Sequence, residues 1–205
     1  MGGIIIPTNT FFNLTEEKQK KILDAAKNEF ITYSYYDASI NRIIKESDIS
    51  RGSFYMYFEN KEDLFIFLMQ KNMDTLLENL TTNIPKDMCD VFTLNLLIYD
   101  FVTSDKIDSD CRKLLKIILT KLDINLINHC VNLQDDKIKI DLIKKYTNIS
   151  KLNISCEKEL VDIADIIFSA VLIEIMFVFS GRNTVLNGRE NIERKFKLIK
   201  QGVLL

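Results

Sequence analysis

Hydrophobic residues recur every three to four positions along most of this chain, which is the spacing of amphipathic helices. Its 205 residues include six glycines and two prolines, so few points force a helix to stop. We therefore predict an all-α protein of about nine helices. The pattern predicts a helix ending near Tyr33, two short helices between Ser39 and Phe58, a long helix from Asn60 to about Leu80, and five more near 87–103, 109–128, 134–147, 156–180 and 188–202.

The first helix has a clear apolar stripe. Ile22, Ala26, Phe30 and Tyr33 fall along one side of it and are expected to face a core. The residues before it, 1–10, are expected to form a mobile arm. Phe12 and Leu14 are expected to staple the start of the helix, with Asn13 or Thr15 as its cap.

The segment from Ser39 to Lys61 reads as two short helices separated by a tight turn. Ser39 and Ser50 are suitable N-caps, and Ile43, Phe54 and Phe58 recur at helical intervals that would turn them inward. The outer face of the second helix then carries cationic, hydroxyl-bearing and glycine positions. A short helix of this composition is suited to the major groove of DNA.

Each position on that face suggests a particular contact with DNA. Arg51 reaches a guanine or a phosphate, Gly52 allows close backbone approach, and Met56 suits a thymine methyl group. Helix N-termini and Lys61 favour phosphates, whereas Arg42 either binds phosphate or pairs with Glu46 four residues later. The candidate DNA-binding residues are Ser39, Arg42, Ser50, Arg51, Gly52, Ser53, Tyr55, Met56, Tyr57 and Lys61.

Over residues 8 to 70 the chain resembles the TetR family of transcriptional regulators. The resemblance rests on an ordered set of short matches: Phe12-Asn13-Leu14, Ala25-Ala26, Phe30, Ser39-Ile40-Asn41-Arg42-Ile43, Ser50-Arg51-Gly52-Ser53-Phe54-Tyr55, Phe58, Asn60-Lys61 and Asp63-Leu64. Ser34 and Asp48 stand where the family usually has glycine, and both sites are expected to need a left-handed backbone. The resemblance implies a DNA-binding domain at 1–60, a helical regulatory domain at 61–205, and dimerisation through the last two helices.

Catalysis and metal binding find little support in the sequence. His129 is the only histidine and stands beside Cys130, so the two side chains would point about 100° apart on a helix. Cys89, Cys111, Cys130 and Cys156 are widely spaced and lack a CxxC pair, which favours small core residues in a reducing cytosol over a redox-sensing thiol. We predict no enzyme activity, no catalytic residue, no metal and no cofactor.

One acidic residue in the C-terminal half is out of place. Glu174 lies opposite Asp165 on a helix that is apolar nearly all round from Leu160 to Phe179. A buried carboxylate needs a partner, which is either a cation or hydroxyl in a dimer interface or a cationic, hydrophobic ligand. In the second case Phe92, Tyr99 and Phe101 would line the same pocket.

Two functions from different classes remain open. The first is a homodimeric, ligand-responsive repressor that binds a double-stranded DNA operator and is released by a hydrophobic small-molecule effector. The second is a helical ligand-carrying or interaction module without DNA binding, which the net charge of −2 would suit. The N-terminal residues lack the basic start and long apolar core of a signal peptide, so a cytoplasmic protein with no membrane partner is expected.

Overall fold

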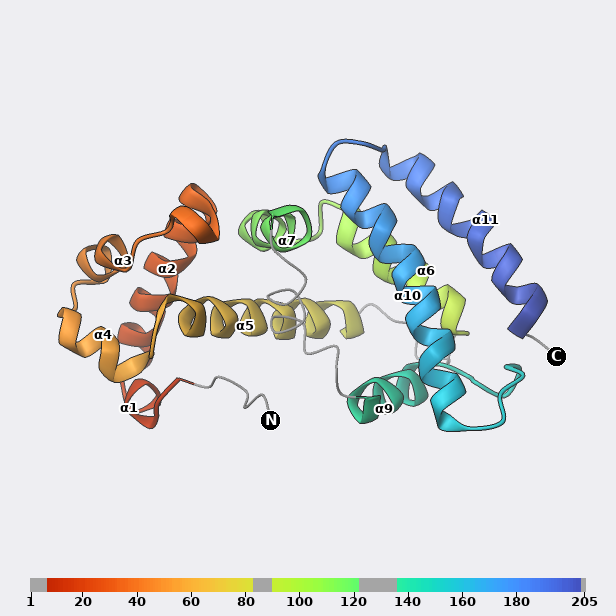
Figure 1. The fold of residues 1–205 in the computed structure, drawn as a ribbon, viewed down its shortest axis with the longest axis horizontal. Helices are drawn as coiled ribbons and strands as arrows, with labels where there is room; N and C mark the ends of the chain where they lie inside the picture. Colours follow the sequence, from red (N-terminus) through yellow and green to blue (C-terminus); the bar gives the residue numbers. More distant parts are fainter. Residues whose placement is uncertain (1–6, 83–89, 122–135, 204–205) are drawn as a thin grey trace. The chain divides into compact units, whose positions relative to one another are not determined.

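The computed structural model of the chain describes residues 7–82, 90–121 and 136–203. These ranges contain ten helices and no β-strand, which confirms the all-α class (Figure 1). The helices are α1 (Asn9–Phe12), α2 (Glu16–Asp37), α3 (Ile40–Ser47), α4 (Arg51–Tyr57), α5 (Lys61–Thr82), α6 (Val91–Thr103), α7 (Ser109–Lys121), α9 (Asp136–Tyr146), α10 (Glu157–Phe179) and α11 (Val185–Val203).

Packing divides the described helices into two compact units. The N-terminal unit contains α1 to α4, α5 up to Thr75, and α7, which packs against α2. The C-terminal unit contains the end of α5 together with α6, α9, α10 and α11. The boundary between these packing units falls inside α5, whereas the division into functional domains at residue 60 stays a prediction.

Helix α2 begins and ends where its sequence signals lie. Thr15 is the N-cap and accepts a hydrogen bond from the backbone N–H of Lys18. The predicted stripe is buried at Ile22, Ala26 and Phe30. The backbone leaves helical geometry at Ser34, with φ 62° and ψ 172°, so the regular helix ends at Tyr33 as predicted. This conformation is one that only glycine adopts without strain.

Tyr33 departs from the predicted stripe. Its side chain is 45 % exposed, because the helix ends there and the ring lies against the guanidinium of Arg42, 4.0 Å from the ring centroid. The aromatic partner of Phe30 is instead Phe65 of α5, a buried residue whose ring meets that of Phe30 edge-on at 4.8 Å.

The predicted mobile arm is wrong for residues 7–10. Pro7 is buried, and Thr8 donates its backbone N–H to the carbonyl of Tyr57 and its hydroxyl to the carbonyl of Met56. Phe11 is fully buried against Phe58, whereas Phe12, the predicted staple, is 45 % exposed. The segment before α2 therefore closes the C-terminal end of α4, whose last carbonyls otherwise have no helical partner.

The two short helices pack as the sequence predicts. Ile43, Phe54 and Phe58 are fully buried, and the Ser50 hydroxyl accepts from the N–H of Ser53 at 3.0 Å. Asp48 ends α3 in the left-handed region, with φ 57° and ψ 46°. The turn between the helices therefore forms with aspartate in place of glycine, a residue that tolerates this region better than most.

In the C-terminal unit, α6, α10 and α11 pack together and α9 packs on α10. The ring of Phe92 on α6 meets Phe196 on α11 at 5.2 Å. The hydroxyl of Tyr99, also on α6, donates to the carbonyl of Val185 at the start of α11. Gly188 makes this approach possible, since a Cβ there would lie 2.3 Å from the Tyr99 hydroxyl oxygen.

The remaining sequence predictions concern the cysteines, the histidine and a possible membrane span. Cys89, His129 and Cys130 lie outside the described residues. Of the other two cysteines, Cys111 is half-buried and Cys156 is exposed before α10, so Cys156 is not the core residue that was predicted. Within the described ranges, none of the helices combines the length and apolarity needed to cross a membrane.

Candidate nucleic-acid interface

The outer face of α4 presents the predicted residues to solvent. Arg51 and Gly52 are exposed, Tyr55 is 45 % exposed and Met56 is 58 % exposed. A Cβ on Gly52 would meet only the Ser50 hydroxyl at 3.7 Å, so packing within the chain does not require glycine there. An exposed glycine without a side chain is what close approach of this backbone to a base edge needs.

The remaining members of this helix are less accessible. Tyr57 is half-buried because its ring meets Phe11 edge-on at 6.2 Å, and Ser53 is half-buried beside its cap, Ser50. Ser53 and Ser50 share a hydrogen bond of 2.8 Å between their hydroxyl oxygens. These side chains stabilise the start and end of α4, whereas Arg51, Tyr55 and Met56 form its accessible surface.

The guanidinium of Arg51 is held between α3 and α4. Its Nη1 donates to the side-chain oxygen of Asn41 at 3.1 Å, and its Nη2 lies 3.5 Å from the Tyr55 hydroxyl. Both partners are neutral and exposed, so the cation keeps its full charge at the surface. A guanidinium in this position can bind the O6 and N7 atoms of guanine or a phosphate.

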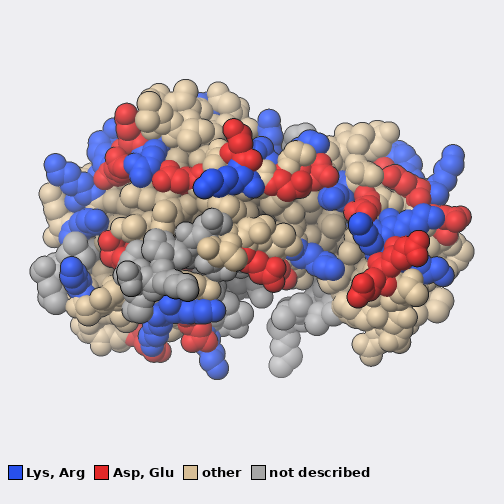
Figure 2. Space-filling view, turned by 180° about the vertical axis from the view of Figure 1, so that it is seen from behind, with Lys and Arg blue, Asp and Glu red and all other residues tan. Residues whose placement is uncertain are grey.

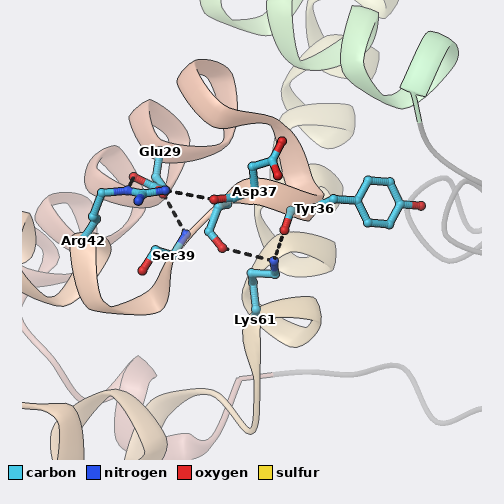
Figure 3. Close-up of polar contacts among 7 residues, drawn as sticks. Glu29, Tyr36, Asp37, Ser39, Arg42 and Lys61 are labelled. Atoms are coloured by element: carbon cyan, nitrogen blue, oxygen red, sulfur yellow. Dashed lines mark hydrogen bonds and ion pairs between the residues drawn. The ribbon is translucent and has the colours of Figure 1, made fainter.

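Arg42 binds within the chain, and its partner is Glu29 of α2 (Figure 3). The predicted alternative partner, Glu46, instead accepts from the side-chain amide of Asn28 at 3.0 Å. Hydrogen bonding to Glu29 raises the pKa of Arg42 above its ordinary value. The i,i+4 pairing is therefore wrong, because α2 supplies a buried carboxylate closer to the guanidinium.

Lys61 also contacts the connection between α2 and α3 (Figure 3). Its Nζ donates to the carbonyls of Tyr36 and Ala38, each at 3.1 Å, and lies 4.9 Å from the centre of the Tyr35 ring. A lysine ammonium has three N–H donors. Among the described residues these two bonds use two of them, and the third is the donor with which Lys61 would bind the predicted phosphate.

Charge on the surface is mixed in sign. On the face drawn in Figure 2, basic and acidic side chains of the described residues lie side by side. The net charge of the whole chain is −2. Long-range attraction to a polyanion is therefore weak, so any affinity for DNA would have to come from local contacts, such as those predicted for Arg51.

Three side chains at this interface were not singled out from the sequence. Glu29 binds Arg42, Asn41 binds Arg51, and Thr8 closes the end of α4. Glu29 was hidden because it lies one residue before Phe30 on a helix whose exposed face is rich in charge. A carboxylate adjacent to the predicted apolar stripe was the available signal, since a buried acid requires a partner.

The candidate effector residues lie in the packing of the C-terminal unit. Glu174 is 2 % exposed, lies opposite the exposed Asp165 as predicted, and accepts from Lys195 at 2.7 Å. Asn183 and Asn191 donate to its other oxygen, at 3.1 and 3.2 Å. Burial alone would raise the pKa of Glu174, but these bonds outweigh it and hold the pKa below its usual value. The carboxylate therefore has a cation of its own chain as a partner, and whether this pair lies in a dimer interface stays a prediction.

The three aromatic candidates are buried as well. Phe92 is 1 %, Tyr99 0 % and Phe101 9 % exposed. Burial raises the pKa of the Tyr99 hydroxyl to about 12, so it remains a hydrogen-bond donor at neutral pH. Phe92 also lies beneath the ammonium of Lys200, 4.8 Å from the ring centroid. The assignment of these residues to a ligand pocket stays a prediction.

Comparison with known families covers both parts of the chain. Residues 22–67 match the family described as "Bacterial regulatory proteins, tetR family". Residues 90–203 match "Tetracyclin repressor-like, C-terminal domain". The chain belongs to the TetR family. Members of this family are transcriptional regulators, generally without enzyme activity, in which a helix-turn-helix domain is followed by a helical domain.

Individual relatives share only part of this protein at the sequence level. An uncharacterized HTH-type transcriptional regulator, YdgC, of Bacillus subtilis is 40 % identical over 53 residues, 26 % of this chain and 27 % of that protein. A fatty acid metabolism regulator protein of the same species is 31 % identical over 69 residues, 34 % of this chain and 36 % of that protein. The chain thus spans about a third of these TetR-family relatives.

Similarity of fold extends over most of the chain. The crystal structure of a TetR-family transcriptional regulator from Syntrophomonas wolfei has a TM-score of 0.63 and is 21 % identical. The likeness covers 93 % of this chain and 98 % of that one. At this identity the comparison supports the shared fold of the TetR-family chain, and the ligand of the C-terminal unit has to be argued separately.

Proposed function

We propose that this TetR-family protein is a cytoplasmic, homodimeric repressor that binds a double-stranded DNA operator and is released by a small-molecule effector. The observation that carries the DNA-binding part is the exposed face of α4, where Arg51, Tyr55 and Met56 project from a helix seated on a fully buried Phe54. An exposed cation beside hydroxyl and apolar groups suits base edges in a major groove.

A stripe on α10 supports the homodimer. Ile166, Ile173 and Phe177 are 55 %, 45 % and 37 % exposed, and their spacing of seven and four residues puts them on one face of the helix. Large apolar side chains exposed in a row mark an interaction surface. A second copy of the same helix would cover this stripe and place one α4 in each half of a two-fold symmetric operator.

The effector is proposed to bind in the C-terminal unit, as ligand responsiveness is typical of the family. The charge of Glu174 already has Lys195 and two amides as partners, which removes the reason to expect a cationic ligand. A hydrophobic, uncharged or weakly polar effector fits the apolar composition of α6 and α10 better. Such a ligand would favour an arrangement of the dimer in which the two α4 helices no longer match the operator.

Selection of duplex fragments by the purified protein tests this function. We expect enrichment of a near-palindromic site whose half-sites lie about 34–36 Å apart or at a larger spacing. Light scattering at micromolar concentration should report a dimer. Failure to enrich any sequence, together with no salt-dependent binding to duplex DNA, would leave the alternative of a helical carrier or interaction module.

A further inference from the structure

Glu29 is a buried carboxylate inside the DNA-binding unit. Its side chain is 3 % exposed and lies on α2, where it faces the start of α3. Among the described residues, its Oε1 accepts from the backbone N–H of Ser39 at 2.7 Å and from Arg42 Nε at 2.8 Å, and its Oε2 accepts from the same Nε at 3.0 Å. The Nη2 of Arg42 lies 2.6 Å from Oε1.

This carboxylate replaces the usual cap of α3. Ser39 occupies the N-cap position, but its side chain makes no capping hydrogen bond. The negative charge of Glu29 lies instead at the N-terminus of α3, where the helix dipole favours an anion. One carboxylate therefore fixes both the backbone that enters α3 and an arginine in the first turn of that helix (Figure 3).

Arg42, which binds Glu29, also contacts the strained C-terminal end of α2. Its Nη2 donates to the carbonyl of Asp37 at 2.9 Å, and its guanidinium lies over the Tyr33 ring. Between these two contacts lies Ser34, whose φ of 62° is unfavourable for a serine. Three contacts of one guanidinium, to Glu29, Asp37 and the Tyr33 ring, thus bridge the segment that joins α2 to α3 and contains this strained residue.

The position of α3 in turn affects the recognition surface. Asn41, next to Arg42 on α3, is the residue that accepts from Arg51 of α4. A shift of α3 would therefore move the acceptor that orients the guanidinium of Arg51. We infer that Glu29 is a positioning residue for DNA binding, which acts through Ser39 and Arg42 on α3. Arg42 then holds α3 in position by binding Glu29 and does not bind phosphate. The inference rests on the proposed DNA-binding function.

A matched pair of variants tests the role of Glu29. Glu29→Gln and Glu46→Gln each remove one negative charge, the second from the exposed surface of α3. Removal of an acid near a polyanion strengthens binding when charge alone acts. If Glu29 positions α3, the opposite is expected for Glu29→Gln: its affinity for the selected operator falls roughly tenfold, because a hydrogen-bonded buried charge is lost. The affinity of Glu46→Gln should stay within about threefold of that of the unchanged protein. If Glu29→Gln binds as tightly as Glu46→Gln, the inference is overturned.

The salt dependence of DNA binding shows whether Arg42 positions α3 or binds a phosphate. Arg42→Lys keeps the positive charge but loses the planar fork that reaches Glu29 and Asp37 together. We expect weaker operator binding by Arg42→Lys, and an unchanged slope of log affinity against log salt for both Arg42→Lys and Arg42→Gln. A slope lowered by about one in Arg42→Gln would show that Arg42 binds phosphate and overturn the inference.

One further measurement keeps the outcome clear. Thermal unfolding of each variant fixes an assay temperature at which it is folded. If Glu29→Gln does not fold, Arg42→Lys decides alone, and wild-type affinity in that variant overturns the inference. If the unchanged protein shows no operator binding at all, the proposed function fails as well, which differs from a protein that binds DNA without regard to Glu29.

Discussion

Arg51 and Asn41 are hydrogen-bonded across the helix-turn-helix: the Nη1 of Arg51 donates to the Asn41 side-chain oxygen at 3.1 Å. The bond joins the exposed ends of α3 and α4, and no charge is neutralised by it. The guanidinium is therefore oriented before any DNA arrives, which reduces the side-chain entropy that binding would otherwise cost.

Asn41→Ala is expected to weaken specific DNA binding by about 1 kcal/mol, the typical value of one hydrogen bond, without a change in salt slope. Titration of a labelled operator by fluorescence anisotropy at several salt concentrations measures both quantities. Asn28→Ala is the matched control, because it removes the same side chain from α2 at a contact with Glu46. Wild-type affinity in Asn41→Ala would show that Arg51 needs no such orientation.

Ser34→Gly is expected to stabilise the protein. Ser34 has φ 62° and ψ 172°, a region that costs a non-glycine residue about 1–3 kcal/mol. Glycine loses more backbone entropy on folding, which offsets part of the gain and leaves roughly 1 kcal/mol. Denaturant unfolding measures the change. Lys20→Gly, at an exposed helical position of α2, should instead lose about 1 kcal/mol, and a loss in both variants would contradict the strain at Ser34.

Much of this architecture was predictable because local signals and burial agree in the N-terminal unit. The apolar spacing of Ile43, Phe54 and Phe58 identified the inward faces, and the helix end at Tyr33 followed from the same pattern. The left-handed backbone at Asp48 followed from the family resemblance, in which glycine is usual at that position. The partners of Arg42, Lys61 and Glu174 did not follow, because they lie on other helices or in the loops between helices. Pairing across helices depends on tertiary packing, which periodicity within one helix does not encode.

Gly188→Ala is expected to destabilise the C-terminal unit by about 1–3 kcal/mol through overpacking. The new Cβ would lie 2.3 Å from the hydroxyl oxygen of Tyr99, a fully buried side chain that cannot move into solvent. Tyr99→Phe removes that oxygen, although it also loses the bond to Val185. In a double-mutant cycle measured by denaturant unfolding, the two changes should cost less together than the sum of each alone. Simple additivity would show that the clash is relieved elsewhere.

Glu174→Gln is expected to destabilise the protein by about 2–3 kcal/mol near neutral pH, because it leaves Lys195 without its charged partner. The folded pKa of Glu174 is lowered from 4.5, so its contribution is present above about pH 4.5 and is lost as pH falls through the folded pKa. The difference in unfolding free energy between the two proteins should thus be constant from about pH 5 to 8 and shrink below that. A difference that grows on acidification would contradict the pairing.

The specificity ratio of Arg51→Ala tests the central claim most directly. The affinity for the selected operator is divided by the affinity for a scrambled duplex of equal length, at one fixed salt concentration. We predict a ratio of about 10³ or more for the unchanged protein and a fall of roughly tenfold or more in Arg51→Ala, as a base contact is worth about 1–3 kcal/mol. Lys61→Ala should weaken both affinities alike and lower the salt slope by about one. A ratio near one for the unchanged protein, or equal ratios for the protein with and without Arg51, would contradict recognition of DNA by α4.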